Sequence, residues 1–128
     1  MNFQSRIFIL KSSISVLLLA AACARHGAEQ ALLDQFFSAS RLRDRTALQK
    51  ISTVILEPLE QGAVTTFTIT NVVDLEGPNG QVQSKQVSVS APVRLPDGRT
   101  AQKTLSVVLE RGDRRTTAPW IVTGFVIR

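Results

Sequence analysis

The chain has 128 residues, of which 44% are hydrophobic and 20% are charged, and its formal net charge at pH 7 is +5. This length suits one domain, and the hydrophobic fraction excludes an intrinsically disordered chain. The single cysteine and the single histidine exclude an intrachain disulfide framework and a zinc site made of Cys and His ligands.

The N-terminal segment has the features of an export signal. Arg6 and Lys11 supply positive charge, and an apolar stretch that ends in three alanines covers residues 14–22. A positive region, a short apolar region and small residues at a cleavage point are typical of a secretory signal peptide. The stretch is shorter than the ~20 apolar residues of a membrane-spanning helix, and an uncleaved anchor that also uses residues 7–10 is the alternative. We therefore predict a signal peptide over residues 1–22, whose removal lowers the net charge to +3.

The only cysteine directly follows this segment. The sequence LAAAC at residues 19–23 resembles the lipobox of bacterial lipoproteins. The resemblance implies cleavage before Cys23, a diacylglycerol thioether on its sulfur, and a lipidated tether over residues 23–27. Because Ala24 is not acidic, the resemblance further implies sorting to the outer membrane or the periplasmic side of the envelope. Ordinary cleavage after an Ala-x-Ala sequence, which would discard Cys23 or leave a free thiol, is the alternative.

Two helices are expected after the tether. Residues 28–40 place their leucines and phenylalanines on one face of a helix and their polar residues on the other. Glu29 falls within the apolar arc, but it lies in the first turn, where a negative charge suits the helix dipole. A second helix over about residues 45–52 would be capped by Asp44, or by Thr46 in a capping box.

Four antiparallel strands follow, because β-branched residues are enriched there and apolar residues alternate with polar ones. They are expected over residues 64–75, 86–95, 100–110 and 120–127. Pro92 has no backbone N–H, so it predicts a bulge, a bend or a stretch without a partner inside the second strand. The sequence thus predicts an α+β fold in which two N-terminal helices pack on a curved four-stranded antiparallel sheet.

Four aromatic residues are candidates to line a pocket, with filling of the core as the alternative interpretation. They are Phe36, Phe37, Phe67 and Trp120. The Thr and Ser side chains of the opposite sheet face form an uncharged surface, which either stays hydrated or binds a partner. Two arginine clusters, at residues 41–45 and 111–115, are either solvated loops or contacts for lipid phosphate or an acidic partner.

Three stretches together resemble a nuclear-transport-factor-2-like domain of the cystatin-like superfold, related to SnoaL. They are the helix ALLDQFF at residues 31–37, the Arg43-Asp44 break before the second helix, and PWIVTGF at residues 119–125. The resemblance covers residues 28–128. It implies a curved sheet around a long helix, a cone-shaped pocket between them, and dimerisation through the open sheet face.

Enzymes of this superfold use Asp–His or Tyr–Asp groups inside the cone. This chain has no tyrosine, and its one histidine, His26, falls in the tether, which argues against an enzyme, a cofactor or a metal. A cystatin-like protease inhibitor is disfavoured because the Gln-x-Val-x-Gly loop is absent. We therefore expect a membrane-anchored envelope lipoprotein that acts as a non-catalytic binding or assembly module, with the bilayer and a protein partner or second copy as partners and no nucleic acid. The alternative is a periplasmic domain that binds a small apolar ligand in the cone.

Overall fold

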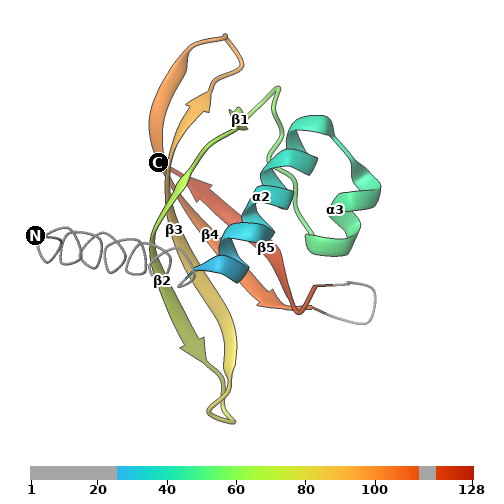
Figure 1. Cartoon of the computed structure of the whole chain (residues 1–128), viewed down its shortest axis with the longest axis vertical. Helices are drawn as coiled ribbons and strands as arrows, with labels where there is room; N and C mark the ends of the chain where they lie inside the picture. Colours follow the sequence, from blue (N-terminus) through green and yellow to red (C-terminus); the bar gives the residue numbers. More distant parts are fainter. Residues whose placement is uncertain (1–25, 113–117) are drawn as a thin grey trace, which may run out of the picture.

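The computed structural model describes residues 26–112 and 118–128. The predicted signal peptide, Cys23 and the second half of the 111–115 cluster lie outside these residues. The elements are α2 (Gly27–Leu42), α3 (Arg45–Ile51), β1 (Ala63–Val64), β2 (Thr68–Glu76), β3 (Val82–Arg94), β4 (Thr100–Arg111) and β5 (Trp120–Ile127). The described part of the chain is α+β, as predicted, with two helices and a curled antiparallel sheet that resembles half a barrel (Figure 1).

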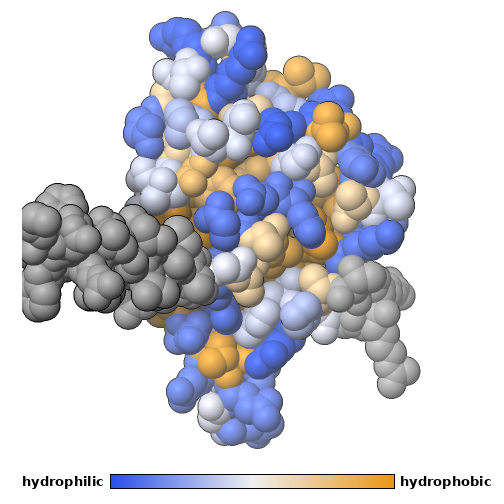
Figure 2. All heavy atoms as spheres, viewed as in Figure 1, coloured by the Kyte–Doolittle hydropathy of each residue, from blue (hydrophilic) through white to orange (hydrophobic). Residues whose placement is uncertain are grey.

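Strand β3 organises the sheet. Strands β1 and β2 pair with one edge of β3, β4 pairs with the other edge, and β5 pairs with β4, all antiparallel. Both helices lie on one side of this sheet, where it curls around α2 (Figure 1). Figure 2 shows hydrophilic atoms over α2 in the middle of the same face, with hydrophobic atoms beside them. The amphipathic character predicted for the first helix is therefore expressed as a buried and a hydrated face.

The first predicted strand, at residues 64–75, is wrong as one continuous strand. The structure divides it into two strands. β1 ends at Val64, β2 begins at Thr68, and residues 65–67 lie between them. Val64 pairs with Val93 and Thr68 pairs with Ser90, so Pro92 falls between the two pairings. Because the backbone nitrogen of Pro92 carries no hydrogen, it cannot donate to a neighbouring strand, and the pairing along this edge of β3 is interrupted there. On its other side β3 runs in unbroken register with β4 through Pro92 and Gln102.

Helix α2 ends where the chain enters the left-handed region at Arg43, with φ of 52°. The N–H of Asp44 donates to the carbonyl of Ala39 over 2.9 Å, which satisfies one of the last carbonyls of the helix. Asp44 then caps α3, since its carboxylate accepts the N–H of Ala47 over 3.1 Å. Of the two predicted caps, the structure therefore uses Asp44.

The core lies between α2 and the concave face of the sheet. On the helix, Leu33, Phe36 and Phe37 are buried, spaced so that they share one side. The Phe36 ring lies 5.5 Å from the ring of Phe37 and 6.1 Å from that of Phe125 on β5. Alternate residues of the two central strands complete the core: Val87, Val89, Ala91 and Val93 on β3, and Leu105, Val107 and Leu109 on β4.

Replacement of Phe36 by alanine is expected to lower the free energy of unfolding by about 3–5 kcal/mol, because it opens a cavity in the packed interior. Phe36 is 0% exposed, whereas Leu42 on the same helix is 75% exposed. Leu42→Ala should therefore change stability by less than about 0.5 kcal/mol. Urea unfolding monitored by circular dichroism would compare the two variants. Similar losses in both would contradict this account of the core.

Candidate functional site

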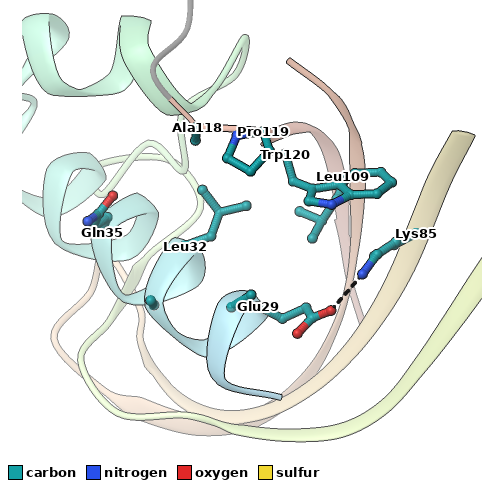
Figure 3. Close-up of a pocket in the computed structure, with 10 residues that line it drawn as sticks. Glu29, Leu32, Gln35, Lys85, Leu109, Ala118, Pro119 and Trp120 are labelled. Carbon is teal, nitrogen blue, oxygen red and sulfur yellow. Dashed lines mark hydrogen bonds and ion pairs between the residues drawn. The ribbon is translucent and has the colours of Figure 1, made fainter. Parts of the chain in front are cut away.

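A cavity of about 190 Å³ opens beside the start of α2. It lies between the first three turns of this helix, the end of β4 and the beginning of β5 (Figure 3). Its walls are formed by Ala28, Glu29, Ala31, Leu32, Gln35, Lys85, Leu109, Ala118, Pro119 and Trp120. Most of these side chains are apolar. Of the polar ones, Glu29 and Lys85 contact each other at one side of the cavity, and Gln35 lies at the other (Figure 3).

The apolar walls arise from the same periodicities as the core. Leu109 continues the buried series of β4, and Leu32 stands one turn before Phe36 on α2. In Figure 3, Leu32 and Leu109 point toward each other across the space, and the Trp120 ring lies beside Leu109. Trp120 is half-buried, and it packs against the edge of the core rather than within it.

A Glu–Lys ion pair forms the polar side of the cavity. Lys85 Nζ donates to Glu29 Oε1 over 2.9 Å, and the two side chains are only 19% and 12% exposed. This contact joins the first turn of α2 to β3, 56 positions later in the chain. Asp74 of β2 stands opposite Lys85 in the ladder, with Oδ1 4.0 Å from Nζ, and its side chain is more exposed than not.

Opposing effects set the pKa of the Glu29 carboxyl. Partial burial acts to raise the pKa, because it removes water from the charged form. The hydrogen bond from Lys85, a backbone hydrogen bond and the positive charge of Lys85 act to lower it. The lowering effects prevail, so the pKa of Glu29 lies below the ordinary value of 4.5 and the carboxylate is ionised at neutral pH.

Two cations lie against the Trp120 ring. Lys85 Nζ is 4.9 Å and Arg111 Cζ is 4.4 Å from the ring centroid, both within the range of a cation–π interaction. Arg111 stands opposite Trp120 in the β4–β5 ladder, and its Nε donates to the carbonyl of Val82 over 3.2 Å. The tryptophan wall of the cavity is therefore electrically positive at its edge.

The structure separates the four aromatic residues proposed from the sequence as pocket candidates. Trp120 lines the cavity. Phe36 and Phe37 are buried in the core, and Phe67 packs on Phe37 with ring centroids 5.1 Å apart. The core alternative thus describes the three phenylalanines, and the pocket alternative describes the tryptophan.

The 41–45 arginine cluster is divided among internal contacts. Arg41 donates to the carbonyl of Val64, and Arg43 pairs with Glu57. Arg45 alone of the three is directed to exposed surface without an ion pair among the described residues. At the other cluster, Arg111 contacts Trp120, whereas Arg114 and Arg115 lie outside the described residues.

Sequence reasoning missed Lys85 and the role of Glu29. The predicted strand began at residue 86, whereas β3 begins at Val82. A two-residue step from Val87 back to Lys85 places the lysine on the core face, and this signal was present in the sequence. Glu29 stands one helical turn before Leu32 and Leu33, so its position in the apolar arc had a packing reason beyond the helix dipole.

The apolar space with a few polar groups is the usual composition of a small-ligand site. Among residues 26–112 and 118–128, no three His, Cys, Asp or Glu side chains gather closely enough to hold a metal ion. Within the same residues, no helix has the length and apolar character needed to cross a bilayer. Comparisons with protein-family models, curated proteins and solved structures gave no match.

Glu29→Gln should lower stability by about 1–2 kcal/mol at pH 7, because it leaves a largely buried lysine without its carboxylate. The folded-state pKa of Glu29 lies below its unfolded value, so its contribution is complete above about pH 4.5 and is lost as the pH falls through the folded-state pKa. Unfolding curves of both proteins between pH 7 and pH 3 should therefore converge at the acidic end. The matched control is Asp34→Asn, an exposed acid on the same helix, which should change little. A constant difference across this pH range would be evidence against the ion pair.

Proposed function

We propose that this chain is a membrane-anchored envelope lipoprotein whose α+β domain is a non-catalytic binding or assembly module of the nuclear-transport-factor-2-like type. The lipobox-like sequence around Cys23 supports the anchor. The curling of the sheet around α2 supports the fold type, since that family is built from a curved sheet and a long helix (Figure 1). The module is proposed to act through the convex face of the sheet, which both helices leave uncovered.

The observation that carries this proposal is an uncharged area across the convex face. Its side chains alternate with the buried ones on β2, β3, β4 and β5. Amide–hydroxyl hydrogen bonds join neighbouring strands, from Gln86 to Ser106 over 2.7 Å and from Gln102 to Ser90 over 2.8 Å. The area comprises Thr68, Ser90 and Thr104, then Asn71, Ser88, Ser106 and Val126, and then Val73, Gln86, Val108 and Gly124.

Two features make this area suited to association. Val73 and Val126 are exposed large apolar side chains on the convex face, at 41% and 54%. Charged side chains, which natural sheets use to prevent association, are confined to one end of these rows, where the backbone of Arg128 pairs with that of Thr104. Depletion of charge at the centre of a surface is a feature of protein interfaces. A protein partner or a second copy of the chain fits this surface.

Cys23→Ala is expected to abolish lipid attachment and to release the protein from the membrane fraction. The physical reason is that acyl chains contribute about 0.8 kcal/mol per buried CH₂, and residues 26–112 and 118–128 contain no helix able to cross a bilayer. Metabolic labelling with an alkyne palmitate analogue and membrane fractionation would measure both effects. Ser13→Ala, within the predicted signal, is the control and should leave both unchanged. Unaltered labelling of Cys23→Ala would refute the anchor.

A photoactivatable phenylalanine analogue at Ser88 should give covalent adducts in cells, because Ser88 lies in the middle of the uncharged area. The same probe at Thr46, an exposed position on α3, should not. Adducts from Ser88 should fall at least about tenfold when Thr104→Arg is added, since an unpaired charge opposes burial at an interface. Equal adducts from both probes, or adducts insensitive to Thr104→Arg, would count against the convex face. Gel mobility separates a second copy from a different partner.

A second candidate function is favoured by the cavity beside Trp120. This is the binding of a small apolar ligand, with Leu32, Leu109 and Trp120 as its apolar contacts (Figure 3). The cavity lies on the opposite side of the sheet from the uncharged area, so the two functions do not exclude each other. The volume limits such a ligand to about one ring, given that an engineered protein cavity of roughly 150 Å³ accepts benzene.

A further inference from the structure

The ammonium group of Lys85 has hydrogen-bonding capacity on the cavity side. A lysine carries three N–H donors, and Lys85 gives one to Glu29 Oε1. Asp74 Oδ1, at 4.0 Å, is beyond hydrogen-bond distance. Within the described part of the chain, the ammonium group of Lys85 makes no further hydrogen bond. A side chain that is 19% exposed and lines an apolar space therefore retains donors for an oxygen atom placed there.

Arg111 does not line the cavity, but it places a second positive charge against the Trp120 ring that forms one wall. Its guanidinium group stacks near Trp120, and only its Nε is engaged, with Val82. Among residues 26–112 and 118–128 it forms no ion pair. Two nearby carboxylates oppose the binding of an anion only weakly. Glu29 is paired with Lys85, and the side chain of Asp74 is 54% exposed, so water screens its charge.

From these contacts we infer that the cavity selects small carboxylates that carry one apolar ring or branched apolar group. The apolar part contacts Trp120, Leu32 and Leu109, and the carboxylate accepts a hydrogen bond from Lys85. Arg111 strengthens the attraction through its charge, and Glu29 holds the Lys85 side chain against the cavity wall. The inference rests on the second candidate function, the binding of an apolar ligand in this cavity.

The charge pattern decides among ligands of the same size. A carboxylate gains the free donors of Lys85 and the field of Arg111, and hydrogen bonds to charged partners are about twice as strong as neutral ones. A neutral hydroxyl accepts a hydrogen bond from Lys85 but gains little from the positive charge of Arg111. An ammonium group is repelled by Lys85 and Arg111, and one of the two carboxylate oxygens of Glu29 is already bonded to Lys85.

Three probes that share one ring test this order: benzoate, benzyl alcohol and benzylamine. The full-length protein, purified from membranes and placed in lipid nanodiscs, would be titrated at neutral pH. Trp120 is the only tryptophan of the chain, so its fluorescence reports from the cavity wall. We expect benzoate to bind about tenfold more tightly than benzyl alcohol, and benzylamine to bind most weakly.

Variants separate the charge from the apolar space. Arg111→Gln should weaken benzoate at least about threefold and leave benzyl alcohol unchanged. Arg45→Gln, which removes an exposed arginine on α3, is the matched control and should change neither. Ala31→Phe, which fills the cavity from its rim, should weaken all three probes.

The possible results distinguish the two claims. Equal affinities for the three probes, or tightest binding of benzylamine, would overturn the carboxylate inference and keep the apolar-ligand function. Fluorescence changes that persist in Ala31→Phe would place the probes outside the cavity and overturn the inference. Absence of binding by all three probes to the unaltered protein would overturn the inference and the second candidate function together.

Discussion

Burial of one face of α2 in the concave side of the sheet is the constraint on which the rest of this structure depends. The sheet contributes every second residue from Val87 to Val93 and from Leu105 to Leu109, and the helix contributes Leu33, Phe36 and Phe37. Burying a side chain of this size stabilises by roughly 1.5–3 kcal/mol relative to exposure. A sheet that curls around a helix has two different faces. The concave face carries apolar side chains that pack on the helix, and the convex face carries mainly uncharged polar ones. The concave face packs against α2 and leaves a cavity at one end, and neither α2 nor α3 covers the convex face (Figure 1).

The filled end and the open end of the concave face differ in the size of the residues that meet there. The ring of Phe36, which is 0% exposed, lies 5.5 Å from that of Phe37 and 6.1 Å from that of Phe125, so large side chains fill this end. At the start of α2, the residues that line the cavity are the small Ala28 and Ala31. Because these side chains do not fill the space next to Leu109 and Trp120, a cavity remains there. The Glu29–Lys85 pair closes the core at this end, because a long acid and a long base can bridge from helix to strand where an apolar residue of ordinary length could not. The same pair makes this end of the core polar. The cavity therefore has a charged side at Glu29 and Lys85 and an apolar side at Leu32 and Leu109.

Sequence periodicity predicted the helices, the four long strands and most core residues, since a period of 3.6 or 2 directly encodes which side of an element is buried. It failed where the determining contact was remote. The break between β1 and β2 depends on Pro92, which lies on a neighbouring strand more than 20 positions later. The cavity likewise depends on Glu29, Lys85 and Trp120, which come from three elements and share no local pattern. Of these, Trp120 was predicted as a candidate because it is an aromatic residue in a strand. Lys85 was missed because the predicted start of β3, residue 86, is four residues later than its start in the structure.

The two proposed surfaces place different demands on the fold. Association through the convex face needs only the uncharged area on β2, β3, β4 and β5, whose residues are placed side by side by the strand register and do not depend on the helix. Ligand binding needs α2 held at a set height above β3 and β5, because Leu32 and Glu29 form one wall and Trp120 the other. A change that shifts the start of α2 would therefore alter the cavity and leave the convex face intact. Since the predicted lipidated tether enters α2 at this end, the position of the first turn is also where attachment to a membrane would act on the domain. The ion pair between Glu29 and Lys85 joins that turn to the sheet. Under the proposed anchoring, this contact would couple the lipidated end of the domain to the shape of the cavity.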